Sequence, residues 1–563
     1  MSEVHGGVLV ARILKREGAR YLFTLNGGHI GPILDACIDE GITLVDARHE
    51  EAAAHMAHGW SWVTGEVGFA TVTAGPGVTN AATGVANAWS SGNPVVLLGG
   101  RPPLKQEGMG AFHEMDQVAF MRPITKWAES ILETERIPEY LTRAIRTALA
   151  GRPGPVFLDI PGDVLRSKVK LEEIWFPAHY KPEARVEGDA QAIEKAVKLL
   201  FEAQKPLLVA GQGVWRSRAT QELRDFVDAL KIPVWLTHNG RGLIPAGHPL
   251  YFPAARSFAL KNADLVLVIG ARFNYVLAYG RPPRFNERAK VVQVDIDPQQ
   301  IGYNRDVEAG ILGDARAVLK QLLQACQERT KPSDRDSSTP WIEALREKDR
   351  EARRNLEPAL NSGAIPIHPL RLCREIRDFV DRSATLVVDG GDILSFARIS
   401  LESYEPGHWL DASTFGCLGQ GLPFALAAKL ARPHQQVLLL VGDGSFGFNA
   451  MEMDTAVRHN LPIVVVISNN AAWAIEKYNQ QVEFKRTVAT DLRYTPYEEM
   501  VKALGGYGVY VERPEELKPA LEKAFASGLP ACINVKTDPA ALSPDSRREI
   551  GTVPADQTLR YEK

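Results

Sequence analysis

Short runs of β-branched and aliphatic residues recur along the whole chain, and nearly every one ends in Gly, Asp or Asn. The clearest runs are GFATVTAG, PVVLLGG, KPLLVAGQG, ADLVLVIGAR, KVVQVDID, ATLVVDGG, QVLLLVGDG and LPIVVVISNN. They alternate with segments of helical periodicity, which is the pattern of βαβ units and parallel sheets. Open α/β sheets bind ligands at the carboxyl ends of their strands. We therefore expect parallel α/β domains whose functional residues follow the strands.

Two polar stretches, near 172–190 and at 326–363, interrupt this alternation. The second is strongly charged and has prolines near its start, so we expect a linker followed by a solvated helix. The chain of 563 residues is longer than one hydrophobic core serves. The prediction is an α/β protein of three doubly wound parallel-sheet domains at 1–172, 190–326 and 360–540, with a polar tail at 541–563.

The charges of the chain are nearly balanced, with 65 Lys and Arg against 68 Asp and Glu and a net charge of -3. This balance creates no general field that would attract nucleic acid or an anionic membrane, so we expect neither as a partner. The five cysteines are scattered without a CxxC pair, which indicates neither a disulfide framework nor a zinc site. Because the sequence shows no signal-peptide core and no apolar run of about 18 residues, we expect a cytoplasmic protein.

A lone carboxylate, Asp443, lies between two glycines directly after the apolar run VLLLV. Asn470 ends the next apolar run, and a right-handed crossover would place both strand ends at the same edge of a sheet. Carboxylate, amide and carbonyl oxygens suit an octahedral Mg²⁺ shell, and glycines let a phosphate approach the backbone. Each half alone is also common as a turn or a helix cap. The pair favours a magnesium and phosphate site.

The arrangement of GDG and NN in these two segments resembles the metal and diphosphate motif of thiamine diphosphate enzymes. The resemblance implies that the Asp443 and Asn470 side chains and the Ala472 carbonyl bind Mg²⁺. The further cofactor-binding residues that it implies are Gly390, Leu418, Gly442, Gly444, Ser445 and Trp473. In TFGCLGQG, Leu418 resembles the aliphatic wedge under the bent cofactor, with an ordinary core residue as the alternative. The glycine pair after VVD also suits a simple turn.

The segment RHEEAAAHMA resembles the activating-glutamate segment of the same enzymes, where the acid directly after His corresponds to Glu50. Thiamine chemistry needs a carboxylate beside the aminopyrimidine ring of the cofactor. Glu51 is the alternative, because either acid suits a first helical turn. The segments TAGPGVTNAATGVANAW and LFTLNGGHIGPIL also resemble the pyrimidine-binding domain, which in the family faces the diphosphate-binding domain of another subunit. A homodimer at least, and a homotetramer by expectation, is implied.

Nearly the whole chain resembles the acetolactate synthase-like superfamily, and three segments favour its 2-hydroxyacyl-CoA lyase and oxalyl-CoA decarboxylase branch. These segments are HPLYFPAARSFALKNADLVLVIGARFNYVLAYGRPPRF, GMGAFHEMDQV and QVDIDPQQIG with LGDARAVLKQLL. The branch implies a lyase that cleaves 2-hydroxyacyl-CoA to formyl-CoA and an aldehyde, or joins them in an acyloin condensation. The alternatives are an acetolactate synthase-like or benzaldehyde lyase-like carboligase acting on free 2-oxo acids or aldehydes, and oxalyl-CoA decarboxylation.

The central third offers a candidate nucleotide pocket. GQGVWRSRA follows an apolar run and carries Arg216 and Arg218, Arg272 ends another run, and Asp295 lies in QVDID. Backbone amides and arginines suit phosphates, and an acid at a strand end suits a ribose. In the lyase and decarboxylase branch this region resembles an ADP site, whereas many acetolactate synthases hold FAD there. The pocket is expected to bind ADP or CoA; solvated arginines and turn-forming acids are the alternative.

Two histidines are the remaining catalytic candidates. His29, in NGGHI, occupies a position where benzaldehyde lyase-like enzymes also carry a histidine, and it could donate a hydrogen bond to a developing alkoxide. His113 stands where lyase relatives have Gln, so its role is open. For both, a structural histidine is the alternative. By resemblance to CoA-dependent relatives, the tail at 541–563 would fold over the active site as a lid.

Overall fold

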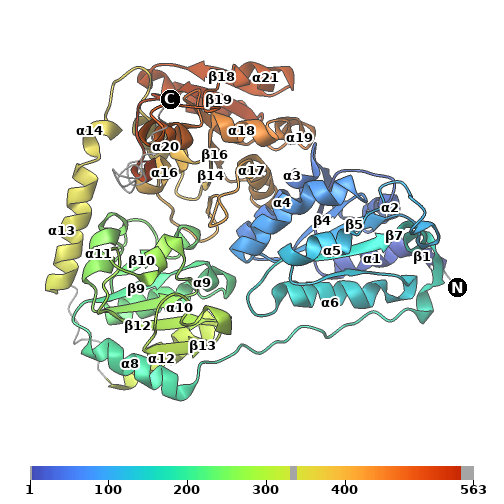
Figure 1. The fold of residues 1–563 in the computed structure, drawn as a ribbon, viewed down its shortest axis with the longest axis horizontal. Helices are drawn as coiled ribbons and strands as arrows, with labels where there is room; N and C mark the ends of the chain where they lie inside the picture. Colours follow the sequence, from blue (N-terminus) through green and yellow to red (C-terminus); the bar gives the residue numbers. More distant parts are fainter. Residues whose placement is uncertain (1–2, 330–338, 547–563) are drawn as a thin grey trace.

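The computed structural model describes residues 3–329 and 339–546, which form three α/β domains, each built on a parallel sheet (Figure 1). In Figure 1 the N-terminal domain runs from blue to cyan, the central domain is green, and the C-terminal domain runs from gold to red. Helices cover both faces of each sheet, so the strands are buried on both sides and appear in the sequence as continuous apolar runs. The expected doubly wound class is confirmed.

The N-terminal domain has a six-stranded sheet in the order β3-β2-β4-β5-β7-β6. Helices α1, α2 and α6 cover one face, and α3 and α4 cover the other. The strands are β2 (Tyr21–Thr24), β3 (Thr43–Asp46), β4 (Gly68–Val72), β5 (Val95–Arg101), β6 (Ala128–Ser130) and β7 (Val156–Pro161). The helices are α1 (Gly6–Arg16), α2 (Gly31–Asp39), α3 (Glu50–Thr64), α4 (Pro76–Ser91), α5 (Gln117–Met121), α6 (Ile137–Leu149) and α7 (Gly162–Arg166). The short strands β1 (Glu3–His5) and β8 (Lys168–Lys170) pair antiparallel as a separate two-stranded sheet.

The central domain has a five-stranded sheet in the order β10-β9-β11-β12-β13. Its strands are β9 (Pro206–Ala210), β10 (Val234–Leu236), β11 (Leu265–Ile269), β12 (Lys290–Asp295) and β13 (Ala309–Leu312). Its helices are α8 (Ala190–Glu202), α9 (Gln212–Arg216), α10 (Thr220–Leu230), α11 (Arg256–Asn262) and α12 (Ala315–Arg329).

The charged stretch after the central domain forms α13 (Pro340–Arg354), followed by the short α14 (Glu357–Leu360). We expected a solvated helix here, but one face of α13 is apolar and packs into the central core through Trp341, Ile342 and Leu345. The Trp341 indole also donates a hydrogen bond to the Pro206 carbonyl. The burial of this helix was not predicted, because the segment is highly charged and only a few apolar residues anchor it.

The C-terminal domain has a six-stranded sheet in the order β15-β14-β16-β17-β19-β18. The strands are β14 (Thr385–Asp389), β15 (Trp409–Leu410), β16 (Val437–Gly442), β17 (Val464–Asn469), β18 (Tyr507–Val511) and β19 (Ala531–Lys536). The helices are α15 (Pro369–Phe379), α16 (Asp392–Ser400), α17 (Gly421–Ala431), α18 (Asp443–Asn449), α19 (Glu452–Arg458), α20 (Ala474–Glu483), α21 (Tyr497–Ala503) and α22 (Leu517–Ala526).

The N- and C-terminal domains share one hydrophobic core, which lies between α3 and α17. Helix α3 is buried on nearly every side because it separates two sheets, and its alanines and Gly59 keep it narrow. A Cβ atom on Gly59 would come within 3.1 Å of the Phe424 Cα atom of α17. The small residues that enrich this helix in the sequence therefore allow the two domains to approach closely.

In each of the three parallel sheets the strand order reverses beside the first strand of the domain's sheet: between β2 and β4, between β9 and β11, and between β14 and β16. Ligands bind α/β sheets in the crevice outside such a reversal, because the connecting loops diverge there. Each domain thus offers a structurally defined place for a site at this reversal.

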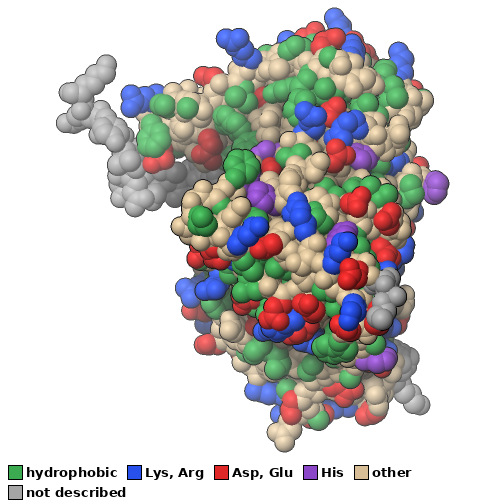
Figure 2. All heavy atoms as spheres, turned by 90° about the vertical axis from the view of Figure 1, so that its right-hand side faces the viewer, with side chains coloured by type: hydrophobic (Ala, Val, Ile, Leu, Met, Phe, Trp, Pro, Cys, Tyr) green, Lys and Arg blue, Asp and Glu red, His purple; other side chains and the backbone are tan. Residues whose placement is uncertain are grey.

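The described helices include none that is long and apolar enough to cross a membrane. Figure 2 shows acidic and basic side chains mixed over the face that it presents, in keeping with the balanced composition.

Candidate active site

The reversal between β14 and β16 opens into a cavity of about 260 Å³. Its walls come from the turns after β14, β16 and β17 and from the loop before α17. The lining includes every residue predicted for the metal and cofactor except Glu50, namely Gly390, Leu418, Gly442, Asp443, Gly444, Ser445, Asn470, Ala472 and Trp473. The structure therefore brings this predicted set together around one cavity, to be called the diphosphate cavity.

Asp443 and Asn470 lie side by side at the edge of this sheet, since β16 and β17 pair in parallel with Gly442 opposite Ser468. Asp443 is 2% exposed and Asn470 is 8% exposed. The Oδ2 atom of Asp443 and the Oδ1 atom of Asn470 are buried without a hydrogen-bond partner among the described residues. Because such groups are costly unless satisfied, two adjacent orphaned acceptors fit a cation that supplies the missing partner.

Burial also raises the pKa of Asp443 to about 7, although backbone N–H groups of its own turn and of Asn470 and Ala471 oppose the rise. The groups named as lowering the pKa of Asp443 among the described residues are backbone N–H groups, so a divalent ion would add a counter-charge to this carboxylate.

Gly444 and Trp473 define the shape of the cavity floor. A Cβ atom on Gly444 would lie 2.5 Å from the Trp473 ring, so only glycine allows the turn to pass the indole. Ser445 is buried, and its hydroxyl accepts a hydrogen bond of 3.2 Å from the Gly419 N–H. This bond ties the turn after β16 to the segment that carries Leu418.

Glu50 is the first residue of α3 and is 7% exposed. Its Oε2 atom accepts a hydrogen bond of 3.0 Å from the Asn80 side chain. Glu50 does not line the diphosphate cavity of its own chain.

Glu51 has different neighbours. Its Oε1 atom lies 3.3 Å from His55 Nε2, which lies 3.8 Å from the Cys417 sulfur. Burial would raise the pKa of Glu51, but the hydrogen bond and charge of His55 lower it. Burial, together with Glu51, raises the pKa of the Cys417 thiol to about 12, so the thiol stays protonated. Glu51 is engaged in this group, which favours Glu50 as the acid available for a cofactor.

The two candidate histidines meet at the reversal between β2 and β4. His29 Nδ1 lies 3.0 Å from the Thr73 hydroxyl, and the rings of His29 and His113 are 5.6 Å apart. The exposed Phe112 stacks on His113 with ring centroids 3.7 Å apart. Burial, with the charges of His113 and Arg166, lowers the pKa of His29, so its imidazole is neutral near pH 7.

The reversal between β9 and β11 forms a second cavity, of about 240 Å³, to be called the central cavity. Of the predicted nucleotide residues, Arg216, Arg272 and Asp295 line it, whereas Arg218 does not. The Nε and Nη2 atoms of Arg216 are buried without a partner among the described residues, while Nη1 donates to the Ser61 carbonyl at 2.7 Å. Burial lowers the pKa of Arg216 to about 9 and raises that of Asp295 to about 6. These orphaned donors fit an anionic ligand.

Sequence reasoning missed Arg152, which also lines the central cavity. It comes from the N-terminal domain, and its Nη2 atom and that of Arg272 both donate to the Ser90 carbonyl, at 2.8 and 2.9 Å. Burial and the charge of Arg272 lower the pKa of Arg152 to about 10. The only available signal was an arginine in the turn GRPGP before a buried run, and nothing in the sequence relates that turn to another domain.

The expected lid at 541–563 lies mostly outside the described residues, which end at 546. Within the described part, the Ser546 hydroxyl donates to Asp392 Oδ1 at 3.3 Å, and the Asp545 N–H donates to the Ser395 hydroxyl at 3.1 Å. Asp392 lines the diphosphate cavity, so the start of the tail contacts its rim.

Three doubly wound domains, with unpartnered buried acceptors in the cavity at one reversal and unpartnered buried donors in the cavity at another, have the architecture of a cofactor-binding α/β protein. Family comparison agrees. The family model "Thiamine pyrophosphate enzyme, N-terminal TPP binding domain" matches residues 4–120, the central domain model matches 193–322, and the "C-terminal TPP binding domain" model matches 389–535. The chain belongs to the thiamine pyrophosphate enzyme family. The predicted resemblance is confirmed.

Similar proteins carry two kinds of name. A "Probable acetolactate synthase" of Mycobacterium bovis is 41% identical over 550 residues, covering 96% of this chain and 97% of that protein. A "2-hydroxyacyl-CoA lyase" of Arabidopsis thaliana is 33% identical over 559 residues, covering 97% of each. The human "2-hydroxyacyl-CoA lyase 1" is 32% identical over 553 residues, covering 96% of this chain and 95% of that protein.

Proposed function

We propose that this thiamine diphosphate enzyme is a Mg²⁺-dependent carbon–carbon lyase. It would cleave 2-hydroxyacyl-CoA to formyl-CoA and an aldehyde, or join these in the reverse acyloin-type condensation. The observation that carries the metal and cofactor assignment is the pair of buried, unpartnered oxygens on Asp443 and Asn470. The CoA assignment is supported by the orphaned donors of the central cavity and by the relatives named as lyases.

The diphosphate cavity would hold the cofactor through its own residues. Asp443, Asn470 and the Ala472 carbonyl would bind Mg²⁺, and the turn at Gly444 and Ser445 would face the diphosphate. When bound, thiamine diphosphate supplies a carbon nucleophile and an electron sink for bonds next to a carbonyl group. The protein residues then determine orientation and proton transfer.

Glu50 would exchange a proton with the aminopyrimidine ring of the cofactor. It does not line the cavity of its own chain, which supports a site completed by a second copy. A homodimer is therefore the smallest active unit that we propose, and a homotetramer is the expected assembly.

His29 and His113 would act at the reacting carbon. Cleavage between C1 and C2 of a 2-hydroxyacyl-CoA requires loss of the 2-hydroxyl proton as the aldehyde forms. The neutral His29 can accept that proton, with Thr73 orienting the ring through Nδ1. In the reverse direction the His29 imidazole returns the proton to the alkoxide.

The central cavity would bind the ADP portion of a nucleotide, either free ADP or CoA. Arg152, Arg216 and Arg272 would face the phosphates, and Asp295 would face a ribose hydroxyl.

The test is to incubate the purified protein with thiamine diphosphate, Mg²⁺ and a 2-hydroxyacyl-CoA and to measure the aldehyde and formyl-CoA. Formation of both in equal amounts is expected. Turnover of pyruvate alone would contradict the CoA assignment while leaving the cofactor assignment intact.

An acetolactate synthase-like carboligase acting on free 2-oxo acids is the second candidate, and the 41% identity to the Mycobacterium bovis protein favours it. Pyruvate consumption with acetolactate formation, and a tightly bound yellow flavin in the purified protein, would support this candidate over the lyase.

A further inference from the structure

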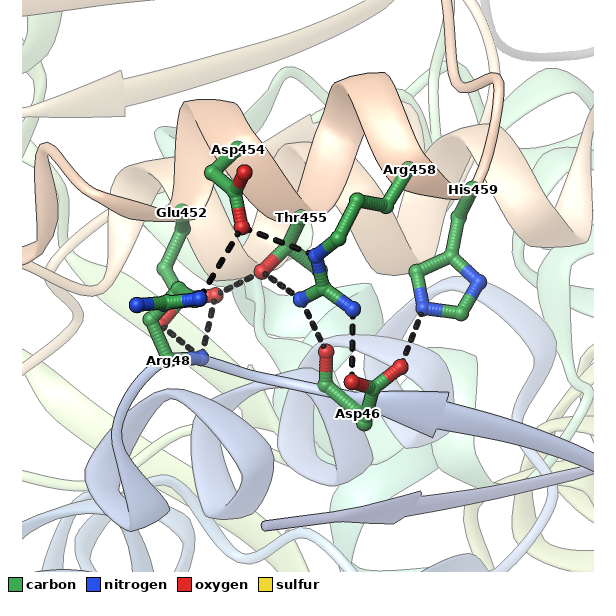
Figure 3. A network of polar contacts seen from close by, with 7 residues as sticks. All are labelled: Asp46, Arg48, Glu452, Asp454, Thr455, Arg458 and His459. Carbon is green, nitrogen blue, oxygen red and sulfur yellow. Dashed lines mark hydrogen bonds and ion pairs between the residues drawn. The ribbon is translucent and has the colours of Figure 1, made fainter. Parts of the chain in front are cut away.

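A cluster of polar residues joins the loop before Glu50 to helix α19 of the C-terminal domain (Figure 3). Figure 3 shows Glu452, Asp454, Thr455 and Arg458 on this helix, with His459 just after it, all near Asp46 and Arg48. These two segments are separated by about 400 residues in the sequence, as the bond between Arg48 and Glu452 spans 404 positions.

Glu452 is the centre of the cluster and is only 1% exposed. Its Oε1 and Oε2 atoms accept the Arg48 backbone N–H at 2.9 and 3.2 Å. The Thr455 hydroxyl donates to Oε2 at 2.6 Å, which orients the carboxylate from its own helix. Hydrogen bonds from a backbone N–H to a buried carboxylate are stronger than neutral ones, so this contact restrains the chain at Arg48.

A second contact restrains the other end of the same loop. The Arg458 guanidinium donates to the Asp46 carboxylate at 2.5 Å and to the Asp46 carbonyl at 2.8 Å, and His459 Nε2 lies 2.9 Å from Asp46 Oδ1. Asp46 ends β3, and α3 begins at Glu50. The short loop between them is therefore held at both ends by the C-terminal domain.

Helix α19 follows α18 closely, and α18 begins at the metal-site residue Asp443. Burial raises the pKa of Glu452 to about 7, although hydrogen bonds from Thr455, Arg48 and His49 oppose the rise. Packing alone does not require an acid at this position, because an apolar residue could fill the same space without the free-energy cost of burying a carboxylate.

We propose that Glu452 is a positioning residue for Glu50: by holding the Arg48 backbone, it fixes where the first turn of α3 presents the Glu50 carboxylate. This inference rests on the proposed role of Glu50 in cofactor activation. It extends that role, because the diphosphate-binding domain of a chain would then determine the position of Glu50 in the same chain.

The first test uses the cofactor-free protein and needs no activity. Amide hydrogen–deuterium exchange at Arg48 and His49 is compared between the unaltered protein and Glu452→Ala. We expect exchange at least about tenfold faster in the variant, because its N–H donors lose a buried acceptor. Asp454→Asn is the matched control for the backbone contact: Asp454 lies on the same helix and contacts the Arg48 side chain at 3.5 Å and the Arg458 guanidinium at 2.8 Å, but not the Arg48 backbone. Its exchange should match that of the unaltered protein.

The second test follows the proton at C2 of bound thiamine diphosphate by its exchange with deuterium, with an acid quench and NMR detection. A displacement of about 1 Å costs about 100-fold in a positioned proton transfer. Glu452→Ala should slow C2 exchange and kcat together by about that factor, with substrate KM and cofactor affinity changed less than about threefold. Glu452→Gln, which keeps one acceptor oxygen, should recover a large part of the rate.

Unchanged C2 exchange in a folded, cofactor-saturated Glu452→Ala would overturn the inference. The inference would also be overturned if C2 exchange were as slow in Glu452→Gln as in Glu452→Ala while hydrogen–deuterium exchange at the Arg48 amide stayed normal. The carboxylate charge, and not the backbone contact, would then matter. Glu50→Gln separates this failure from failure of the proposed function. If Glu50→Gln retains fast C2 exchange, Glu50 itself has no activating role.

Discussion

The diphosphate cavity and the central cavity occupy equivalent strand-order reversals, yet their unsatisfied groups have opposite character. In the diphosphate cavity the orphaned atoms are acceptors, on Asp443 and Asn470; in the central cavity they are donors, on Arg216. The groups of one region therefore suit a cation and those of the other an anion. The same architecture can be specialised for opposite ligands by a few residues after the strands.

The two cavities also differ in how many domains build them. The proposed metal ligands Asp443 and Asn470 follow successive strands of one sheet, whereas Arg152 and Arg272 approach the central cavity from two domains and share the Ser90 carbonyl. A site within one sheet is set by strand register, while a site between domains depends on how those domains dock.

The largest expected effect separates catalysis from binding. Glu50→Gln should lower kcat by about 10²- to 10⁴-fold, the range for a positioned acid or base. Mg²⁺–thiamine diphosphate binding, ADP binding at the central cavity and the thermal midpoint should all be retained, as measured by calorimetry and thermal unfolding. Glu51→Gln is the matched control with a smaller loss, since Glu51 is paired with His55. The assignment would be wrong if Glu51→Gln were the inactive variant.

The next effect concerns the cation-accepting region. Asp443→Ala should weaken Mg²⁺-dependent binding of thiamine diphosphate by at least about 100-fold, because loss of a metal ligand exceeds the 10- to 100-fold typical of groups behind the ligands. The variant Asp443→Asn keeps the shape and removes the buried charge, so its cofactor-free protein should unfold at a temperature no lower than the original. The exposed Asp491 provides the control Asp491→Asn. Normal cofactor affinity in Asp443→Ala would refute the ligand assignment.

A smaller effect is expected in the anion-accepting region. Arg216→Met should weaken ADP binding by about 10-fold or more, the value of a hydrogen bond to a charged group. Thiamine diphosphate binding should be unaffected. Arg218→Met, at an exposed position outside the cavity, is the control. The central cavity is not a nucleotide site if Arg216→Met and Arg218→Met both bind ADP as tightly as the original protein does. The same conclusion follows if the original protein does not bind ADP.

The smallest effect lies at the third reversal, where the rings of His29 and His113 lie 5.6 Å apart. The pKa of His29 is lowered by burial, by His113 and by Arg166. Activity that needs the neutral imidazole should persist as the pH falls to this lowered pKa and decline below it. Arg166→Gln removes one positive charge and raises the His29 pKa, so the acid limb of the kcat profile should move to higher pH by less than about one unit. Arg166→Lys should leave it in place, and an unmoved limb in Arg166→Gln would show that His29 does not control it.

Features formed within one sheet could be predicted from the sequence, whereas features that depend on contacts between domains could not. The three sheets and the grouping of Asp443 with Asn470 could be predicted, because buried parallel strands leave long apolar runs and parallel register brings their ends together. Arg152 could not be predicted, since its place depends on domain docking. Glu452 was missed for a related reason: its partner is a backbone N–H about 400 positions away, and a single acid in a helix has no pattern of its own. The burial of α13 was missed because few apolar residues anchor it.

The most direct test of the account is a crystal structure with thiamine diphosphate and Mn²⁺ in place of Mg²⁺, with the metal located by its anomalous signal. We expect one peak in the diphosphate cavity, ligated by the Asp443 and Asn470 side chains, the Ala472 carbonyl and the diphosphate oxygens. Glu50 from a second copy of the chain should face the aminopyrimidine ring. A peak whose ligands exclude Asp443 and Asn470, or a cofactor lying at another strand edge, would show that the proposed metal and cofactor site is wrong.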